Sequence, residues 1–408
     1  MDIYDELVLW AQDQGVELHG VAPRELPGRG VGIVAMKHIK TGDLLLQIPT
    51  SVLRTIDTVR PEVKQSLPKD AKVHALLAAD LALDSSTSKY SIWNAVVPSR
   101  ESITASLPLA WDTRLHSFLP KPALALLRKQ QAKFNRDWGI VQQSPLAAAA
   151  AAGSSSSAAT TPTITTAAAD THPLAATINR QDYLYAWLLV NTRTFYHETR
   201  QTAARLARDD RMVLQPVADL LNHADAGECA VAFDVSGFTV AAARDYVPGD
   251  EIHICYGKHH NDLLLVEYGF VLTGGNRWDE VCIDDAVLPA LSAAQRALLD
   301  ERGFLANYVL DAGTVCYRTQ VALRLLCCVS AGEWERLVND GEDGGEILQE
   351  EVDRLLVRLL RKYRGTVESK IRELEALEVG LPSQREILCT RWQQIGRLVD
   401  QTIERLDA

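Results

Sequence analysis

The chain has 408 residues, enough for two or three domains, and its composition is that of an ordinary folded protein, with 47% hydrophobic and 23% charged residues. It contains no run of about 18 apolar residues, so we expect no transmembrane helix and no membrane partner. Its first residues are acidic, which argues against a secretory signal peptide. The net charge of −11 disfavours nucleic acid as the main partner and is compatible with a basic one.

The seven cysteines include no CxxC pair, which argues against a disulfide framework and against a structural zinc cluster. We therefore expect no metal site and a reducing compartment, the cytosol or the nucleus or both. The charge is unevenly distributed, because residues 277–408 carry 17 basic and 24 acidic side chains, a net charge of −7. This segment is either a set of solvated helix faces or a docking surface for a basic protein.

In chain order, apolar spacing predicts a short amphipathic helix over 4–14. A glycine-rich turn over 28–32 precedes a predicted strand at 33–35, and a buried strand is predicted over 44–48, closed by Pro49. The pattern is helical between about 61 and 138.

Residues 144–171 are almost entirely Ala, Ser, Thr and Pro, with no amphipathic stripe, which predicts a disordered insertion. Helical pattern resumes over 181–194. Alternating segments at 229–233 and 238–242 flank Ser-Gly and predict a β-hairpin, and a further strand is predicted over 251–255. From about 288 onward the pattern is helical.

Two polar segments are candidates for chemistry. The glycines in Gly28–Gly32 allow close backbone approach to a polar ligand, but taken alone the segment is better explained as a plain turn. No helix follows it, as a dinucleotide site requires. In Asp219–His223, the Asn-His pair could be a metal, catalytic or ligand-orienting pair. On this segment alone, the favoured explanation is that Asn222 caps the end of a helix beside an ordinary histidine.

Two aromatic segments have similar alternatives. Tyr256, at the end of a predicted strand in Gly249–Gly257, is either a core residue with a satisfied hydroxyl or a reactive one. Tyr268 and Phe270, in a Tyr-Gly-Phe segment, could be mere aromatic packing.

The order of these segments resembles that of SET-domain methyltransferases. The matching motifs are GxG, NTRTF at 191–195, DxxNH at 219–223, GDEIHICYG at 249–257 and YGF at 268–270. The likeness is greatest to the branch typified by the plant Rubisco large-subunit lysine methyltransferase, which lacks zinc-binding cysteine clusters. It implies an α+β fold with a β-rich, knotted SET core over 1–275. The core holds a helical insertion at about 60–190, and an all-α substrate-binding domain follows over 276–408.

The resemblance implies S-adenosylmethionine as cofactor. It assigns the backbone around Arg29, Gly30 and Val31 to the lining of the cofactor site. The remaining cofactor contacts it implies are Arg193 with the carboxylate, Asn222 and the His223 backbone with the amino-acid and adenine portions, and Phe270 stacked on the adenine.

The resemblance also makes Tyr256 the catalytic residue, its hydroxyl placed between the methyl group and the acceptor amine. Tyr268 is expected to complete an aromatic channel around the target side chain, because ring faces stabilise partial positive charge. Asp219 could accept a hydrogen bond from the substrate or could simply cap a turn.

Two positions indicate which side chain is methylated. A related branch that methylates a histidine of actin carries Asn where this chain has Phe195, and Trp where it has Ala218. An imidazole needs a polar partner that Phe195 cannot provide, and Ala218 leaves room for a longer, flexible side chain. Both differences therefore favour lysine. The alternatives are a protein-histidine methyltransferase and a non-catalytic SET scaffold that binds peptides.

We therefore expect a protein-lysine N-methyltransferase that acts on a non-histone protein. A ribosomal or translation-related protein is the preferred substrate, because the resemblance extends to fungal enzymes of this branch that act on such proteins, and a histone is the alternative. The basic substrate is expected to dock on the acidic helical domain. We expect a monomer, with no nucleic-acid partner, in the cytoplasm, the nucleus or both.

Overall fold

The computed structural model describes residues 1–147, 177–226, 229–233, 237–339 and 345–407. Most of the predicted insertion at 144–171 lies outside these ranges. The chain forms two compact units, one of Met1–Ile103 with Gln130–Cys255 and the other of Thr104–Lys129 with Tyr256–Ala408. This division rests on contacts and differs from the expected domain boundary at 275, which stays a prediction.

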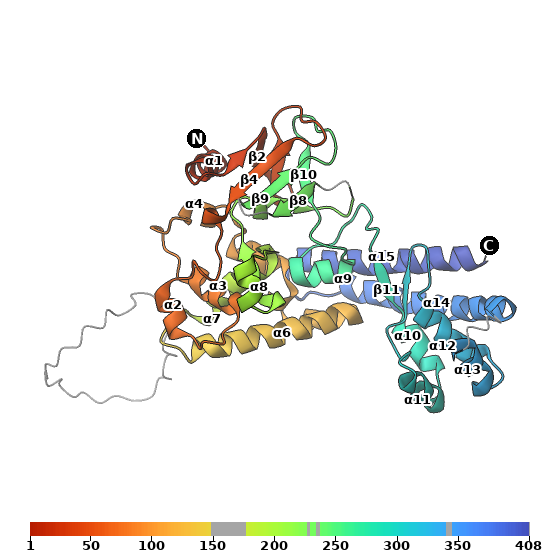
Figure 1. Cartoon of the computed structure of the whole chain (residues 1–408). Helices are drawn as coiled ribbons and strands as arrows, with labels where there is room; N and C mark the ends of the chain where they lie inside the picture. The colour runs from red at the N-terminus through yellow and green to blue at the C-terminus, as the bar shows by residue number, and fades with distance from the viewer. Residues whose placement is uncertain (148–176, 227–228, 234–236, 340–344, 408) are drawn as a thin grey trace, which may run out of the picture. The chain divides into compact units, whose positions relative to one another are not determined.

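The first unit contains two four-stranded sheets with strand orders β1-β4-β9-β8 and β2-β3-β10-β7, and a two-stranded sheet of β5 and β6. Figure 1 labels β2, β4, β8, β9 and β10 of the two four-stranded sheets. The strands are β1 (Glu17–Leu18), β2 (Val21–Leu26), β3 (Gly30–Ala35), β4 (Leu44–Pro49), β5 (Thr194–Tyr196), β6 (Met212–Leu214), β7 (Asn222–His223), β8 (Ala230–Phe233), β9 (Gly237–Ala241) and β10 (Glu251–Ile254).

The predicted hairpin is confirmed, because β8 pairs antiparallel with β9 and Phe233 lies opposite Phe238. The predicted strands near residues 33 and 44 are β3 and β4. Both bury consecutive apolar residues, Ile33–Ala35 on β3 and Leu45 and Leu46 on β4, as strands covered on both faces do. Gly237 at the start of β9 is obligatory, because a Cβ there would lie 1.9 Å from the Ile48 carbonyl oxygen.

The helices of the first unit confirm the helical segments predicted on both sides of the insertion. Helix α7 begins with Asn179 as its N-cap, whose side chain accepts hydrogen bonds from two backbone N–H groups. The helices are α1 (Ile3–Asp13), η1 (Thr50–Val52), α2 (Pro61–Ser66), α3 (Val73–Ala82), α4 (Ser91–Asn94), α5 (Arg100–Ser106), α7 (Arg180–Arg193), α8 (Arg200–Arg205), η4 (Arg208–Asp210) and η5 (Ala218–Leu220). Helix α5 and helix α6 (Lys121–Gln142) each cross the division between the units.

The second unit is mainly helical, as predicted, and its long helices α14 (Gly345–Glu375) and α15 (Pro382–Asp407) run side by side (Figure 1). A continuous apolar core includes residues of both helices, among them Leu356, Leu360, Leu388 and Ile395. The prediction missed one feature, a two-stranded sheet of β11 (Glu280–Cys282) and β12 (Val309–Asp311), in which Val281 lies opposite Leu310. Each of these strands has three residues, too few for alternation to be recognised.

The elements of the second unit are η2 (Pro108–Ala110), η3 (Thr113–Phe118), α9 (Asn261–Leu263), η6 (Leu264–Tyr268), β11 (Glu280–Cys282), α10 (Asp284–Val287), η7 (Leu288–Ala290), α11 (Ala293–Glu301), β12 (Val309–Asp311), α12 (Tyr317–Cys327), α13 (Ala331–Asn339), α14 (Gly345–Glu375) and α15 (Pro382–Asp407). No helix within the described ranges combines the length and apolar character needed to cross a membrane.

Candidate active site

The glycine-rich segment is the turn of the β2–β3 hairpin. Gly28 and Gly30 have φ angles of 74° and 72°, a left-handed conformation that glycine adopts without strain. Arg29 at the turn is 60% exposed, and its guanidinium lies 2.5 Å from the carboxylate of Glu251 on β10. The turn is therefore tied to the strand that leads toward Tyr256.

Asn222 lies in a strand and not at the end of a helix, so the capping explanation of this residue is wrong. Its Nδ2 donates to Glu251 Oε1 at 2.8 Å and to the Val31 carbonyl oxygen at 3.4 Å. Gly32 makes this approach possible, because a Cβ there would lie 3.0 Å from Asn222 Nδ2 and 2.9 Å from Glu251 Oε1.

Glu251 is a residue that the sequence analysis did not single out. Burial raises the pKa of its carboxyl, but hydrogen bonds from His253 and Asn222, together with the charges of His253 and Arg29, bring that pKa below its ordinary value. Glu251 therefore remains ionised and holds Arg29 and Asn222 together. Glu251 lies within the GDEIHICYG motif at 249–257, and that motif was the sequence signal from which this residue could have been found.

The pairing of β7 with β10 brings two distant motifs side by side. Strand β10 pairs in parallel with β7, with His253 opposite Asn222 and Ile254 opposite His223, and it also pairs antiparallel with β3. Tyr256 follows two residues after the end of β10. The Asn-His pair thus lies beside the strand that leads directly to the tyrosine.

Arg193 is the last residue of α7, and its Nη1 donates to the carbonyl oxygen of Asp219 at 2.6 Å and to its Oδ2 at 3.0 Å. The Asp219 side chain is completely buried, and Trp93 Nε1 lies 3.1 Å from both of its oxygens. Burial raises the pKa of Asp219, which Arg193 and Trp93 partly oppose. The carboxylate thus has partners inside the unit, and a role toward substrate stays a prediction.

The two residues that predicted a lysine acceptor lie near this segment in the chain but in different surroundings. Phe195 on β5 is half-buried and packs edge-on against Phe238, with ring centroids 5.4 Å apart. Ala218 is fully buried at the start of η5, directly after Val217, whose φ of 79° is unusual for a β-branched residue.

In the second unit, Tyr256 and Tyr268 have ring centroids 5.0 Å apart, and Phe270 lies 6.3 Å from Tyr268. Gly269 places these rings, because its φ of 82° ends the helical turn Leu264–Tyr268 in the left-handed conformation. The structure thus brings Tyr256, Tyr268 and Phe270 into one aromatic cluster. Among the described residues, no group of three or more His, Cys, Asp or Glu side chains is arranged to hold a metal ion.

Two protein-family models match this chain. Residues 30–257 match the family model of the SET domain. The chain belongs to the SET-domain family. In this SET-domain protein, residues 279–405 match a second family model, described as the ribosomal lysine N-methyltransferase 2 C-terminal domain.

Individual relatives agree with this assignment. SET domain-containing protein 4 from Mus musculus is 26% identical over 343 residues, which cover 79% of this chain and 72% of that protein. Ribosomal lysine N-methyltransferase set11 from Schizosaccharomyces pombe is 27% identical over 150 residues, 37% of this chain and 38% of that protein. The solved structure of Rubisco LSMT bound to AdoMet aligns with a TM-score of 0.59 at 17% identity, covering 100% of this chain and 93% of that one, which establishes a shared fold.

Proposed function

We propose that this SET-domain protein is an S-adenosylmethionine-dependent protein-lysine N-methyltransferase acting on a non-histone protein. The observation that carries the proposal is the parallel pairing of β7 with β10, which sets Asn222 and His223 beside the strand leading into Tyr256. Relatives named as ribosomal lysine methyltransferases and the C-terminal family match support lysine as the acceptor and a ribosomal protein as substrate.

The residues present fit S-adenosylmethionine. Arg193 Nε is buried and has no hydrogen-bond partner among the described residues, so an anionic group such as the cofactor carboxylate would satisfy it. Asn222, the backbone of His223 and the turn at Arg29–Val31 would hold the remaining polar portions, and Phe270 the adenine.

When bound, the cofactor supplies a methyl group on a positively charged sulfur. The acceptor lysine must be a neutral amine, although a free lysine has a pKa near 10.4. Burial and the nearby positive charge both lower that pKa, so no dedicated base is required, and alignment supplies much of the acceleration. The Tyr256 hydroxyl orients the amine lone pair, and the ring of Tyr268 lines the path of the side chain.

Tyr256→Phe tests the proposal, because it removes the hydroxyl and keeps the ring that packs on Tyr268. We expect methyl transfer into lysate proteins from radiolabelled cofactor to fall by at least about 100-fold, while cofactor affinity by calorimetry changes little. Retained activity would refute the role of Tyr256. Absence of cofactor binding by the wild-type protein would instead favour the peptide-binding scaffold.

The identity of the modified residue separates lysine from histidine. Phe195 packs on Phe238 and offers no hydrogen bond to an imidazole, which is why we favour lysine. Mass spectrometry of the labelled peptide identifies the acceptor, and methylhistidine would overturn the assignment. We further propose that the acidic C-terminal segment docks the basic substrate, and that the protein acts as a monomer in the cytoplasm, the nucleus or both.

A further inference from the structure

Trp93, on the short helix α4, is fully buried and contacts the candidate site from a distant part of the sequence. Its indole N–H is shared between both oxygens of Asp219, at 3.1 Å each. The same carboxylate accepts from Arg193 Nη1 at 3.0 Å. A buried carboxylate is held in place by the donors that surround it. Trp93 therefore restricts the orientation of the Asp219 carboxylate, which in turn orients the Arg193 guanidinium.

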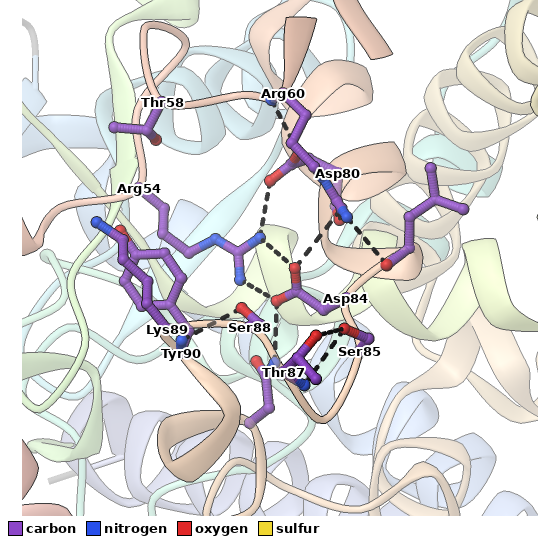
Figure 2. A network of polar contacts seen from close by, with 12 residues as sticks. Arg54, Thr58, Arg60, Asp80, Asp84, Ser85, Thr87, Ser88, Lys89 and Tyr90 are labelled. Carbon is purple, nitrogen blue, oxygen red and sulfur yellow. Dashed lines mark hydrogen bonds and ion pairs between the residues drawn. The ribbon is translucent and has the colours of Figure 1, made fainter. Parts of the chain in front are cut away.

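The ring of Trp93 is itself held by a buried cation. Arg54 is 2% exposed, and its guanidinium carbon lies 5.8 Å from the centroid of the Trp93 ring and 4.8 Å from that of Tyr90. Figure 2 shows the Arg54 guanidinium directed at the carboxylates of Asp80 and Asp84, which it meets at 2.8 and 2.5 Å.

These two carboxylates keep the cation in place and also fix α4. Burial by itself lowers the pKa of Arg54, but Asp84 and Asp80 raise it above its ordinary value, so the guanidinium remains charged. Asp84 also accepts from Asn94 Nδ2 at 2.9 Å, on the residue directly after Trp93. Helix α4 has only four residues, so such contacts and not helix propensity hold it.

We propose that Trp93 is a positioning residue for the cofactor site, which acts by holding the Asp219 carboxylate that orients the Arg193 guanidinium. The proposal rests on the proposed function, in which Arg193 meets the carboxylate of S-adenosylmethionine. In this arrangement Asp219 uses Arg193 Nη1, and Nε is left for the ligand. Loss of the indole N–H removes one donor that fixes the Asp219 carboxylate. The Arg193 guanidinium is then less well preorganised to bind the cofactor carboxylate.

Trp93→Phe tests the proposal, since it removes the N–H and keeps a ring. Trp187→Phe is a matched control in the same unit, because Trp187 is also fully buried and its indole N–H also bonds a carboxylate, Asp137 Oδ2, at 3.1 Å. We expect S-adenosylmethionine to bind Trp93→Phe about tenfold more weakly by calorimetry and Trp187→Phe unchanged, at comparable loss of melting temperature. Equal weakening in both variants would overturn the proposal.

A double-mutant cycle shows whether Trp93 acts through Asp219. In the Asp219→Asn background, the charge that holds Arg193 is already absent, so Trp93→Phe should weaken cofactor binding by less than about twofold. A further tenfold loss would refute the relay. Asp219→Asn alone should also weaken binding about tenfold, which keeps the proposal testable if Trp93→Phe does not fold.

The pH dependence of cofactor binding is a readout that a purely structural role would not change. The groups facing the Asp219 carboxylate are Arg193 from α7 and Trp93 from α4, with Arg54 behind Trp93 and Tyr185 near Arg193. Removing a donor to the ionised form raises the pKa of Asp219, so the loss of affinity on acidification should begin at higher pH in Trp93→Phe. Superimposable profiles would contradict the proposal, whereas a wild-type protein that binds no cofactor contradicts the proposed function instead.

Discussion

Replacing Arg391 by Met should strongly destabilise the second unit. Arg391 is fully buried on α15, and it donates to Asp262 and to Asp279 at 2.7 Å each and to the Glu280 carbonyl oxygen at 3.0 Å. Burial alone would lower the pKa of Arg391, but the two carboxylates raise it above its ordinary value, so the cation persists. Methionine removes this charge and leaves both carboxylates buried.

The loss can be estimated from the contacts that remain. Asp279 keeps two donors from Asn261, at 3.0 and 3.2 Å, whereas Asp262, 2% exposed, loses the one hydrogen-bond donor it has among the described residues. Breaking a buried pair in this way costs about 3–5 kcal/mol of the free energy of unfolding, a large part of the roughly 5–15 kcal/mol that stabilises a typical protein.

Urea unfolding followed by far-UV circular dichroism measures the loss. The matched control is Arg354→Met on α14, where arginine and glutamate side chains are 71% and 89% exposed and 4.0 Å apart, so the cost should stay below about 0.5 kcal/mol. Adding Asp262→Asn to Arg391→Met should recover part of the stability, because the unpaired charge is then removed. A loss below about 1 kcal/mol for Arg391→Met, or no recovery, would refute this reasoning.

Two further predictions concern the site and the substrate. Gly32→Ala should weaken cofactor binding by at least about tenfold, because the added Cβ would lie 2.4 Å from Leu26 Cδ1 and displace Asn222; Gly139→Ala, with nothing within 4 Å of its Cβ, should leave affinity unchanged by calorimetry. Equal affinities of the two variants would contradict this. Substrate binding should weaken as salt is raised from 0.05 to about 0.5 M, because screening reduces attraction to the acidic C-terminal segment. Salt-insensitive binding would exclude this docking mode.

The sequence by itself determined much of the local structure. Alternation around Ser236–Gly237 predicted the β8–β9 hairpin, and apolar spacing predicted α1 and the C-terminal helices, because such patterns report which face of a single element is buried. Five motifs in a fixed order indicated the SET family before any contact was known. The short strands β11 and β12 were not predicted, because three residues are too few to show the alternation of apolar and polar side chains that marks a strand.

Tertiary structure alone decided which partners the site residues have. Asp219 could be assigned from the sequence to a turn or to a substrate, but its buried contacts with Trp93 and Arg193 join segments up to 126 residues apart. Glu251 likewise gained its role only when β10 paired with β3 and β7. Hydropathy and spacing describe neighbours along the chain, whereas the pairing of distant strands and the desolvation of a carboxylate depend on packing between segments, and this packing sets the charge and orientation of the candidate site.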